Sequence, residues 1–223
     1  MNASPSITAI VVCRNEAAHL RACLPRLRWV DELIVIDLGS TDHSRGIAEH
    51  WADTVYDHPP SPIVEPVRMF AAERATHDWL LFVDPDERYP RALADDARRA
   101  AARYADAAIV SLPMHYYFKG RRLTCTAWGK DPHYRPALVH RGRCDLTPDI
   151  CRGFAPHEGT STRRVTPTDD NIIQHLWMDS YTQFIAKHWR YARREGELQS
   201  CRGDRTVWEA LVRQPLRELR LNL

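Results

Sequence analysis

Three carboxylates stand within four positions where a short apolar run ends, and their types and spacing suit them to chemistry. Asp84, Asp86 and Glu87 follow the apolar run 79–83, and Pro85, which has no backbone N–H, interrupts any strand there. Two aspartates one residue apart offer hard oxygen ligands to a divalent cation, which would keep several waters and bridge to substrate phosphates. The alternative is a strand that ends in a solvated acidic turn, and an Asp-x-Asp pattern alone does not decide between them.

The elements that must position these acids predict an α/β fold. The unbroken apolar run 79–83 is typical of a strand buried inside a parallel sheet. Two β-branched runs, 7–12 and 33–36, alternate with stretches of helical spacing, the order that produces a doubly wound parallel sheet. Such sheets bind ligands at the carboxyl ends of their strands. We expect further helices at 41–51, 67–76 and 91–104, and further strands at 54–56, 107–113, 134–140 and 171–175.

Acidic residues follow three of these strands and indicate a nucleotide-binding edge. Glu16 follows the first strand, Asp37 and Asp42 follow the second, and Asp84 and Asp86 follow the buried run. Carboxylates accept hydrogen bonds from ribose hydroxyls and from the imino N–H of uracil. Neither G-x-G-x-x-G nor G-x-x-x-x-G-K-[ST] is present, so carboxylates, a metal and arginines would hold the nucleotide. Asp42 has a second interpretation as a helix cap, and the pattern leaves both open.

Composition limits the class of protein. The chain has 223 residues, 44% apolar and 27% charged, enough for one large α/β domain or one domain with an appendage. A net charge of +2 gives no reason to expect a nucleic-acid partner. The six cysteines show no Cys-x-x-Cys spacing, which indicates reduced thiols in a cytoplasmic protein. The polar stretch 1–6 predicts no secretory signal, and no run of about 18 apolar residues predicts a membrane span.

The pattern changes twice along the chain. Residues 1–113 are typical of a nucleotide-binding half, and residues 114–178 are irregular and aromatic, as expected of a half that covers the acceptor. Residues 179–223 predict amphipathic helices, in which arginines beside apolar stripes fit contact with an anionic membrane surface. Helices docked on their own domain fit the same pattern. The sequence leaves the oligomeric state open, a homodimer included.

Three stretches resemble the family 2 glycosyltransferases of GT-A fold, in the bacterial branch that includes lipopolysaccharide-core β-glucosyltransferases. They are Ala9–Glu16, Glu32–Asp42 and Asp78–Glu87. The resemblance is strong over residues 7–90 and continues more weakly to about residue 195. It implies a Rossmann-like GT-A domain with a mostly parallel central sheet flanked by helices. It also implies transfer of a sugar from a nucleotide diphosphate donor with inversion, using Mg²⁺ or Mn²⁺.

The same resemblance implies which residues hold the nucleotide-sugar donor. Arg14, Glu16 and Asp42 would contact the uridine of a UDP-sugar. Arg68 falls where the family often has a basic residue near the nucleotide. Asp84 would face the ribose or the sugar. Residues 1–113 would then form the nucleotide-sugar-binding half of one GT-A domain.

Three further residues would carry the chemistry in the resembling family. Asp86 would ligate the metal, with His175 as a second ligand, and Glu158 would be the general base. The plainer interpretations are a core histidine at His175 and a surface glutamate at Glu158. The family usually has a small residue at the position of Pro85 and asparagine at that of Met69, and these departures concern the identity of the donor.

The sequence therefore predicts an inverting, metal-dependent glycosyltransferase of the cytoplasm or of the inner face of the membrane. Its acceptor would be a saccharide, a lipid-linked saccharide, a peptide or a small natural product. One alternative is a sugar nucleotidyltransferase, which would need a glycine- and lysine-rich first loop that Arg14-Asn15-Glu16 does not supply. The other alternative is a non-catalytic nucleotide-sugar-binding protein of the same fold.

Overall fold

A computed structural model describes residues 5–104, 106–124, 132–148 and 153–183, with residues 185, 186 and 189. The helices are α1 (Ala17–Cys23), the 3-10 helix η1 (Leu24–Leu27), α2 (Ser44–Trp51), α3 (Glu65–Ala72) and α4 (Arg91–Arg103). The strands of the first half are β1 (Ile7–Cys13), β2 (Glu32–Asp37), β3 (Thr54–Asp57), β4 (Trp79–Val83), β5 (Glu87–Arg88) and β6 (Ala107–Phe118). The later strands are β7 (Arg121–Arg122), β8 (His133–His140), β9 (Cys144–Leu146), β10 (Phe154–Pro156), β11 (Ser161–Arg164) and β12 (Ile173–Met178).

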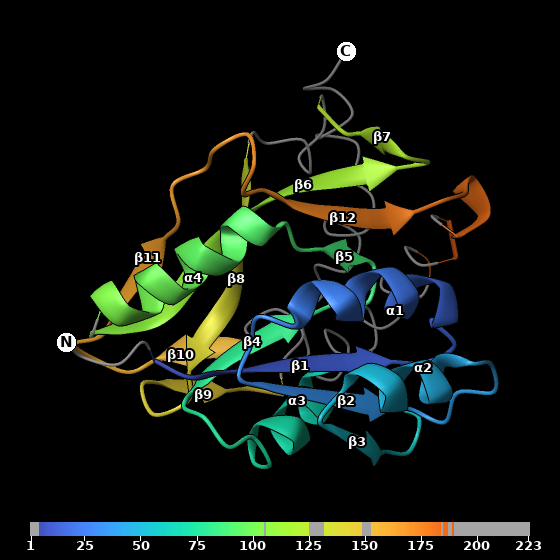
Figure 1. Cartoon of the computed structure of the whole chain (residues 1–223), viewed down its shortest axis with the longest axis horizontal. Coiled ribbons are helices and arrows are strands. Elements are labelled where there is room, and N and C mark those ends of the chain that lie inside the picture. The colour runs from blue at the N-terminus through green and yellow to red at the C-terminus, as the bar shows by residue number, and fades with distance from the viewer. Residues whose placement is uncertain are drawn as a thin grey trace, which may run out of the picture. The chain divides into compact units, whose positions relative to one another are not determined.

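Four parallel strands form the part of the sheet that the sequence predicts best. The sheet order is β3-β2-β1-β4-β8-β6-β12-β5, and β7 and β11 also pair with β6. Ile10 of the central strand β1 lies opposite Ile34 of β2 and Phe82 of β4, and β2 pairs in parallel with β3. The arrows of β1 to β4 point the same way in Figure 1. We call the edge where these strands end the carboxyl edge, and the edge where they begin the amino edge.

Both faces of the parallel strands are covered, which explains their unbroken apolar sequences. Ile10, Ile34 and Phe82 form one core cluster with Val67 and Ala71 of α3. Side chains of opposite parity, such as those of Val11, Val35 and Leu81, point to the other face and are just as buried, with at most 1% of their surface exposed. The α/β fold with a buried parallel half is therefore confirmed.

The later strands extend this sheet with antiparallel pairs, except that β11 pairs with β6 in parallel, and they depart from the expected bounds. Strand β8 runs antiparallel to β4, with Leu138 opposite Leu81. Strand β6 continues through Pro113 to Phe118, although we expected it to end at the proline. Strand β11 pairs with β6 up to Ser111, and β7 pairs with it from Tyr117, so Pro113 lies outside both of these pairings.

Close contacts divide the chain into two compact units. The first contains residues up to 114 and 134–175, and it holds every site residue predicted above. In the second, Tyr116 is buried and packs edge-to-face on Trp177 and His133, which is the role of a core aromatic. No helix in the described ranges is long and apolar enough to cross a bilayer. The amphipathic segments predicted around 190–194 and 207–220 lie outside the described residues.

Three cysteines fall in the described ranges, and all three thiols are free and buried. Burial raises the pKa of Cys13 to about 12, and the charge of Asp37 adds to the effect. A thiol that stays protonated at neutral pH is a poor nucleophile and a poor metal ligand. These thiols therefore fit the prediction of reduced, structural cysteines.

Candidate active site

Asp84 begins the loop after β4 and is held between two arginines at the carboxyl edge. Its Oδ1 accepts a hydrogen bond from Nη2 of Arg68 on α3 at 2.7 Å. Its Oδ2 lies 3.2 Å from Nη2 of Arg135 on β8. The two guanidinium groups come from elements on different sides of β4 in the sequence, and each takes one carboxylate oxygen. Asp84 is therefore fixed in orientation before any ligand binds.

Glu87 lies behind Asp84 and is fully buried. Its Oε2 accepts a hydrogen bond from Nη1 of Arg135 at 2.7 Å and one from the backbone N–H of Asp84 at 3.2 Å. Burial raises the pKa of Glu87 to about 7, and the positive charge of Arg135 opposes that rise. The same Nη1 atom lies 2.7 Å from the carbonyl oxygen of Phe82 and 3.3 Å from the hydroxyl of Tyr89. Arg135 thus joins the end of β4 to both Asp84 and Glu87.

Asp86 meets His175, which the chain brings from 89 positions away. Strand β12 pairs with β5 so that His175 lies opposite Glu87, and Nε2 of His175 lies 3.2 Å from Oδ2 of Asp86. His175 is only 8% exposed. Burial lowers its pKa, but the hydrogen bond and charge of Asp86, with the charges of Glu87 and Asp84, raise the pKa above its ordinary value overall. The predicted pair of metal ligands is therefore brought together.

The loops after β1 and β2 are tied to each other at the same edge. Asn15 adopts a left-handed backbone with φ of 54°, and its Oδ1 accepts the N–H of Thr41 at 2.7 Å. Asp42 accepts the N–H of Ala17 at the start of α1 at 3.1 Å and that of Ser44 at the start of α2 at 2.9 Å. Asp42 thus supplies an acceptor to the first N–H of each helix, although the N-cap position of α1 is Glu16 and that of α2 is His43. The contact of Asp42 with uridine stays a prediction.

Replacing Asp42 with alanine should lower the melting temperature, because the first N–H groups of both helices lose their acceptor. Hydrogen bonds from Ser44, with one from Ala17, hold the pKa of Asp42 below its usual value. This stabilisation is therefore present at neutral pH and is lost as the pH falls through the carboxylate range. Thr41→Ala is the control, since the backbone N–H of Thr41 still reaches Asn15. Equal melting temperatures for both variants and the parent would contradict this role.

Arg14 and Glu16 lie in the loop after β1, at the carboxyl edge. The side chain of Arg14 is exposed, and that of Glu16 is half-buried. The backbone N–H of Glu16 donates to Oγ of Ser44 at 2.8 Å, which fixes the loop. Both residues are thus placed at the edge where the fold would bind a nucleotide, and their contacts with uridine stay predictions.

Glu158 lies at the other edge of the sheet. Strand β10 pairs with β9 so that Pro156 lies opposite Cys144, and the N–H of His157 donates to the carbonyl of Arg143 at 2.9 Å. Arg143 follows β8 three residues after His140, which pairs with Trp79 at the start of β4. Figure 1 shows the link between β10 and β11 on the side where β4 begins. These contacts place the segment that carries Glu158 nearer the start of β4 than the end that Asp84 follows, and the role of Glu158 as base stays a prediction.

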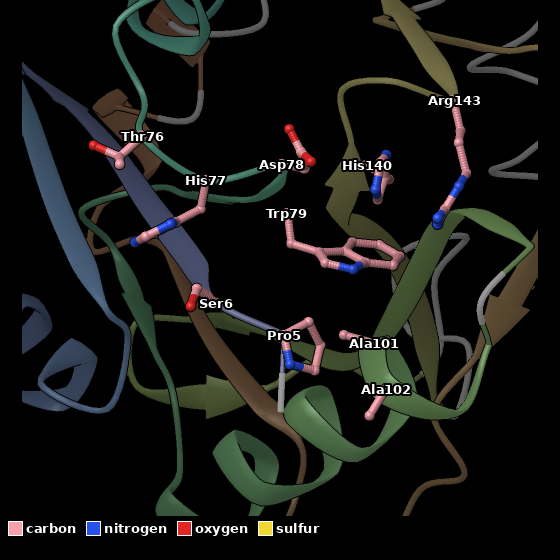
Figure 2. Close-up of a pocket in the computed structure, with 10 residues that line it drawn as sticks. All are labelled: Pro5, Ser6, Thr76, His77, Asp78, Trp79, Ala101, Ala102, His140 and Arg143. Atoms are coloured by element: carbon pink, nitrogen blue, oxygen red, sulfur yellow. The ribbon is translucent and has the colours of Figure 1, made fainter. Parts of the chain in front are cut away.

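A pocket of about 480 Å³ opens at the amino edge and not beside the carboxylates. Figure 2 shows Trp79 and His140 side by side in it, with Pro5 and Ala101 across from them. Nearer the site, Arg68 lines a much smaller pocket with Phe154 and Thr147. We place the candidate site at the carboxylates all the same, because the charged groups that suit a nucleotide diphosphate converge there.

The sequence analysis missed Arg135 and the role of Glu87. Glu87 lies in the resembling stretch Asp78–Glu87, and Arg135 lies in the weaker continuation of the resemblance, but no motif marks either residue. A signal was present for each: Arg135 is a charged residue inside the apolar run of a strand, and Glu87 directly follows a proposed metal ligand. Buried charges are rare unless they are paired, so a charged residue in a strand pattern predicts a partner.

The fold and the site together define a GT-A glycosyltransferase scaffold, and comparison with known proteins places the chain in a family. Residues 8–156 match the family model described as glycosyl transferase family 2. The chain belongs to this family. The structure is similar to that of a mannosyltransferase from Pyrobaculum calidifontis, solved with GDP-Man and Mn²⁺, with a TM-score of 0.57 and 17% identity over 86% of this chain and 62% of that one. That likeness confirms the GT-A fold.

Two curated relatives show how the chain compares in sequence. It is 25% identical to the lipopolysaccharide core biosynthesis glycosyltransferase LpsC of Rhizobium meliloti over 94% of this chain and 77% of LpsC. It is 33% identical to an uncharacterized glycosyltransferase of Rickettsia felis over 49% of this chain and 40% of that protein. The chain therefore spans most of the first relative and less than half of the second.

Proposed function

We propose that this chain transfers a sugar with inversion from a nucleotide diphosphate sugar, a UDP-sugar, to an acceptor hydroxyl, with Mg²⁺ or Mn²⁺ bound. The observation that carries the proposal is the carboxyl edge. There Asp86 and His175 lie 3.2 Å apart, beside an Asp84 that two arginines hold. Membership of glycosyl transferase family 2 supports the reaction class. The donor nucleotide, the metal and the stereochemistry are the proposed parts.

The residues present fit a divalent cation that is shared with a substrate. No three His, Cys, Asp or Glu side chains in the described ranges converge on one point. Asp86 and His175 supply one oxygen and one nitrogen ligand, and a cation of this kind takes its remaining ligands from phosphate and water. When bound, the cation would offset the charge that develops on the leaving diphosphate.

The remaining side chains would bind and orient the donor. Arg68 gives one of its N–H groups to Asp84 and has others for a phosphate oxygen, because a guanidinium carries five donors. The carboxylate of Asp84 would accept a hydrogen bond from a ribose or sugar hydroxyl. Glu16 and Asp42 add further acceptors along the same edge. In an inverting transfer a base takes the acceptor's proton on the face opposite the diphosphate, and the position of Glu158 leaves that base unassigned.

The acceptor and the location are also proposals. Similarity to LpsC supports a lipopolysaccharide core saccharide as the first acceptor to test, at the inner face of the membrane. A homodimer is not needed for the site, because every residue named at the carboxyl edge comes from one chain.

UDP together with Mn²⁺ should raise the melting temperature, because a ligand that binds only the folded state stabilises it by about 2.7 kcal/mol at 100 times its Kd. Calorimetry and thermal melts would measure this with UDP, GDP and AMP, each with Mn²⁺ or with EDTA. A shift with UDP that EDTA removes supports the metal site. Binding without hydrolysis or transfer of any UDP-sugar would favour a non-catalytic nucleotide-sugar-binding protein. No shift with any nucleotide would overturn the proposed function.

A further inference from the structure

We propose that Arg135, clamped on Glu87, is the positioning residue that holds the Asp84–Asp86 loop in the geometry needed to bind donor and metal. The inference rests on the proposed function and names a residue outside the predicted site. Arg135 comes from β8, which runs antiparallel to β4, and only 12% of its side chain surface is exposed. It contacts the carbonyl of Phe82 at the end of β4, the carboxylate of Asp84 and the buried carboxyl group of Glu87.

The contacts of Arg135 have the geometry of a clamp. Nη2 lies 3.2 Å from Oδ2 of Asp84, and Nη1 lies 2.7 Å from both Oε2 of Glu87 and the carbonyl of Phe82. The Phe82 carbonyl belongs to the end of β4, and Asp84 and Glu87 bracket the remaining residues of the loop. The guanidinium group of Arg135 thus contacts the end of β4 and the loop residues on either side of Asp86, which are Asp84 and Glu87.

Glu87 makes this clamp possible. Its second contact, from the N–H of Asp84 at 3.2 Å, closes the loop from inside, while the N–H of Glu87 donates to the carbonyl of Asp84 at 3.0 Å. A loop closed on itself in this way presents Asp86 toward His175. Replacing a group that orients a metal ligand commonly lowers metal affinity or activity by about 10- to 100-fold.

The turn after β8, beside the start of β4, contains an arginine that serves as the control. Arg141 follows the same strand β8, and its Nε lies 3.1 Å from Oδ1 of Asp78 while Nη1 donates to the carbonyl of Ala75 at 2.7 Å. Both arginines therefore join a carboxylate and a backbone carbonyl across β4. They differ in that Arg135 acts at the carboxyl edge and Arg141 at the amino edge.

The test compares Arg135→Lys with Arg141→Lys in the full chain. Lysine keeps the charge, but a single ammonium cannot span the carboxylates and the carbonyl as the fork does. We expect Arg135→Lys to weaken binding of UDP with Mn²⁺ and to lower kcat, each by about 10- to 100-fold. We expect Arg141→Lys to leave both within about twofold. Its melting temperature should fall less than that of Arg135→Lys, because Arg135 is 12% exposed and pairs with a fully buried Glu87, whereas Arg141 is 35% exposed and pairs with a 65% exposed Asp78.

The readouts separate positioning from stability and from failure of the proposed function. Affinity and kcat are compared at a temperature where the parent and both variants are folded. If Arg135→Lys then binds UDP with Mn²⁺ as the parent does, with the same kcat, the inference is overturned. If the parent itself binds no nucleotide, the proposed function fails instead. Should Arg135→Lys not fold, Glu87→Gln keeps the shape and removes the charge that anchors Arg135. Parent-like affinity and kcat in that variant would overturn the inference equally.

Discussion

Asp86→Asn is expected to lower the rate of sugar transfer by about three orders of magnitude while the protein stays folded. Asparagine keeps the size of the side chain and one oxygen, but it loses the negative charge that a divalent cation needs. Among the described residues, the hydrogen-bond partner of Asp86 is His175, at 3.2 Å, so replacing Asp86 disturbs little of the core. Transfer and donor hydrolysis, each followed with and without added Mn²⁺, would measure the loss.

Asp78→Asn is the matched control for this variant. Asp78 stands directly before β4, as Asp84 stands directly after it, and pairs with Arg141 at 3.1 Å at the amino edge. Its side chain is 65% exposed, so its loss should change stability little. Transfer should therefore remain near the parent rate. Full turnover by Asp86→Asn, or undiminished turnover of the parent in EDTA, would contradict the metal site.

Leu81→Ala should give the largest loss of stability among simple changes that spare the site. Leu81 is fully buried in the middle of β4, between Ala9 of β1 and Leu138 of β8. Removing its side chain leaves a cavity on the face of the sheet to which it points, which costs about 3 kcal/mol in the free energy of unfolding. For a domain of this size the melting temperature should then fall by about 6–12 °C.

Urea denaturation with near-ultraviolet and far-ultraviolet probes would measure this loss. Leu81→Met is the control, because a nearly volume-conserving exchange costs less than about 1.5 kcal/mol. The affinity of Leu81→Ala for UDP with Mn²⁺ should stay within a few-fold of the parent at temperatures where it is folded. A melting temperature equal to that of Leu81→Met would show that the face of β4 to which Leu81 points is not packed as described.

Local pattern predicted the parallel half well, because its signals are contained in a few neighbouring residues. The apolar run 79–83 gives β4 its bounds, and the β-branched run that begins at residue 7 gives most of β1. The acids that follow these strands reach one edge because parallel strands all end on the same side. Alternating order alone predicted that much, and the resemblance to family 2 glycosyltransferases added the roles of the residues.

Long-range pairing decided what local pattern leaves open. No spacing rule links Arg135 to Glu87, 48 positions apart, or places Glu158 at the amino edge. Strand β6 runs through Pro113, which local pattern predicted as its end. The register of a strand depends on which strands it pairs with, and packing across the whole sheet decides that pairing.

The amino-acid sequence alone thus determined the family, the α/β class and the acids at the ends of the strands, because hydrophobic period and short motifs are read locally. The tertiary structure decided which charges face each other. It placed Asp84 and Glu87 against Arg135 and His175 beside Asp86. It also placed Asp42 where it accepts the first N–H of two helices. Charges buried in a sheet are stable only when another strand supplies the opposite charge, so their partners come from the fold as a whole.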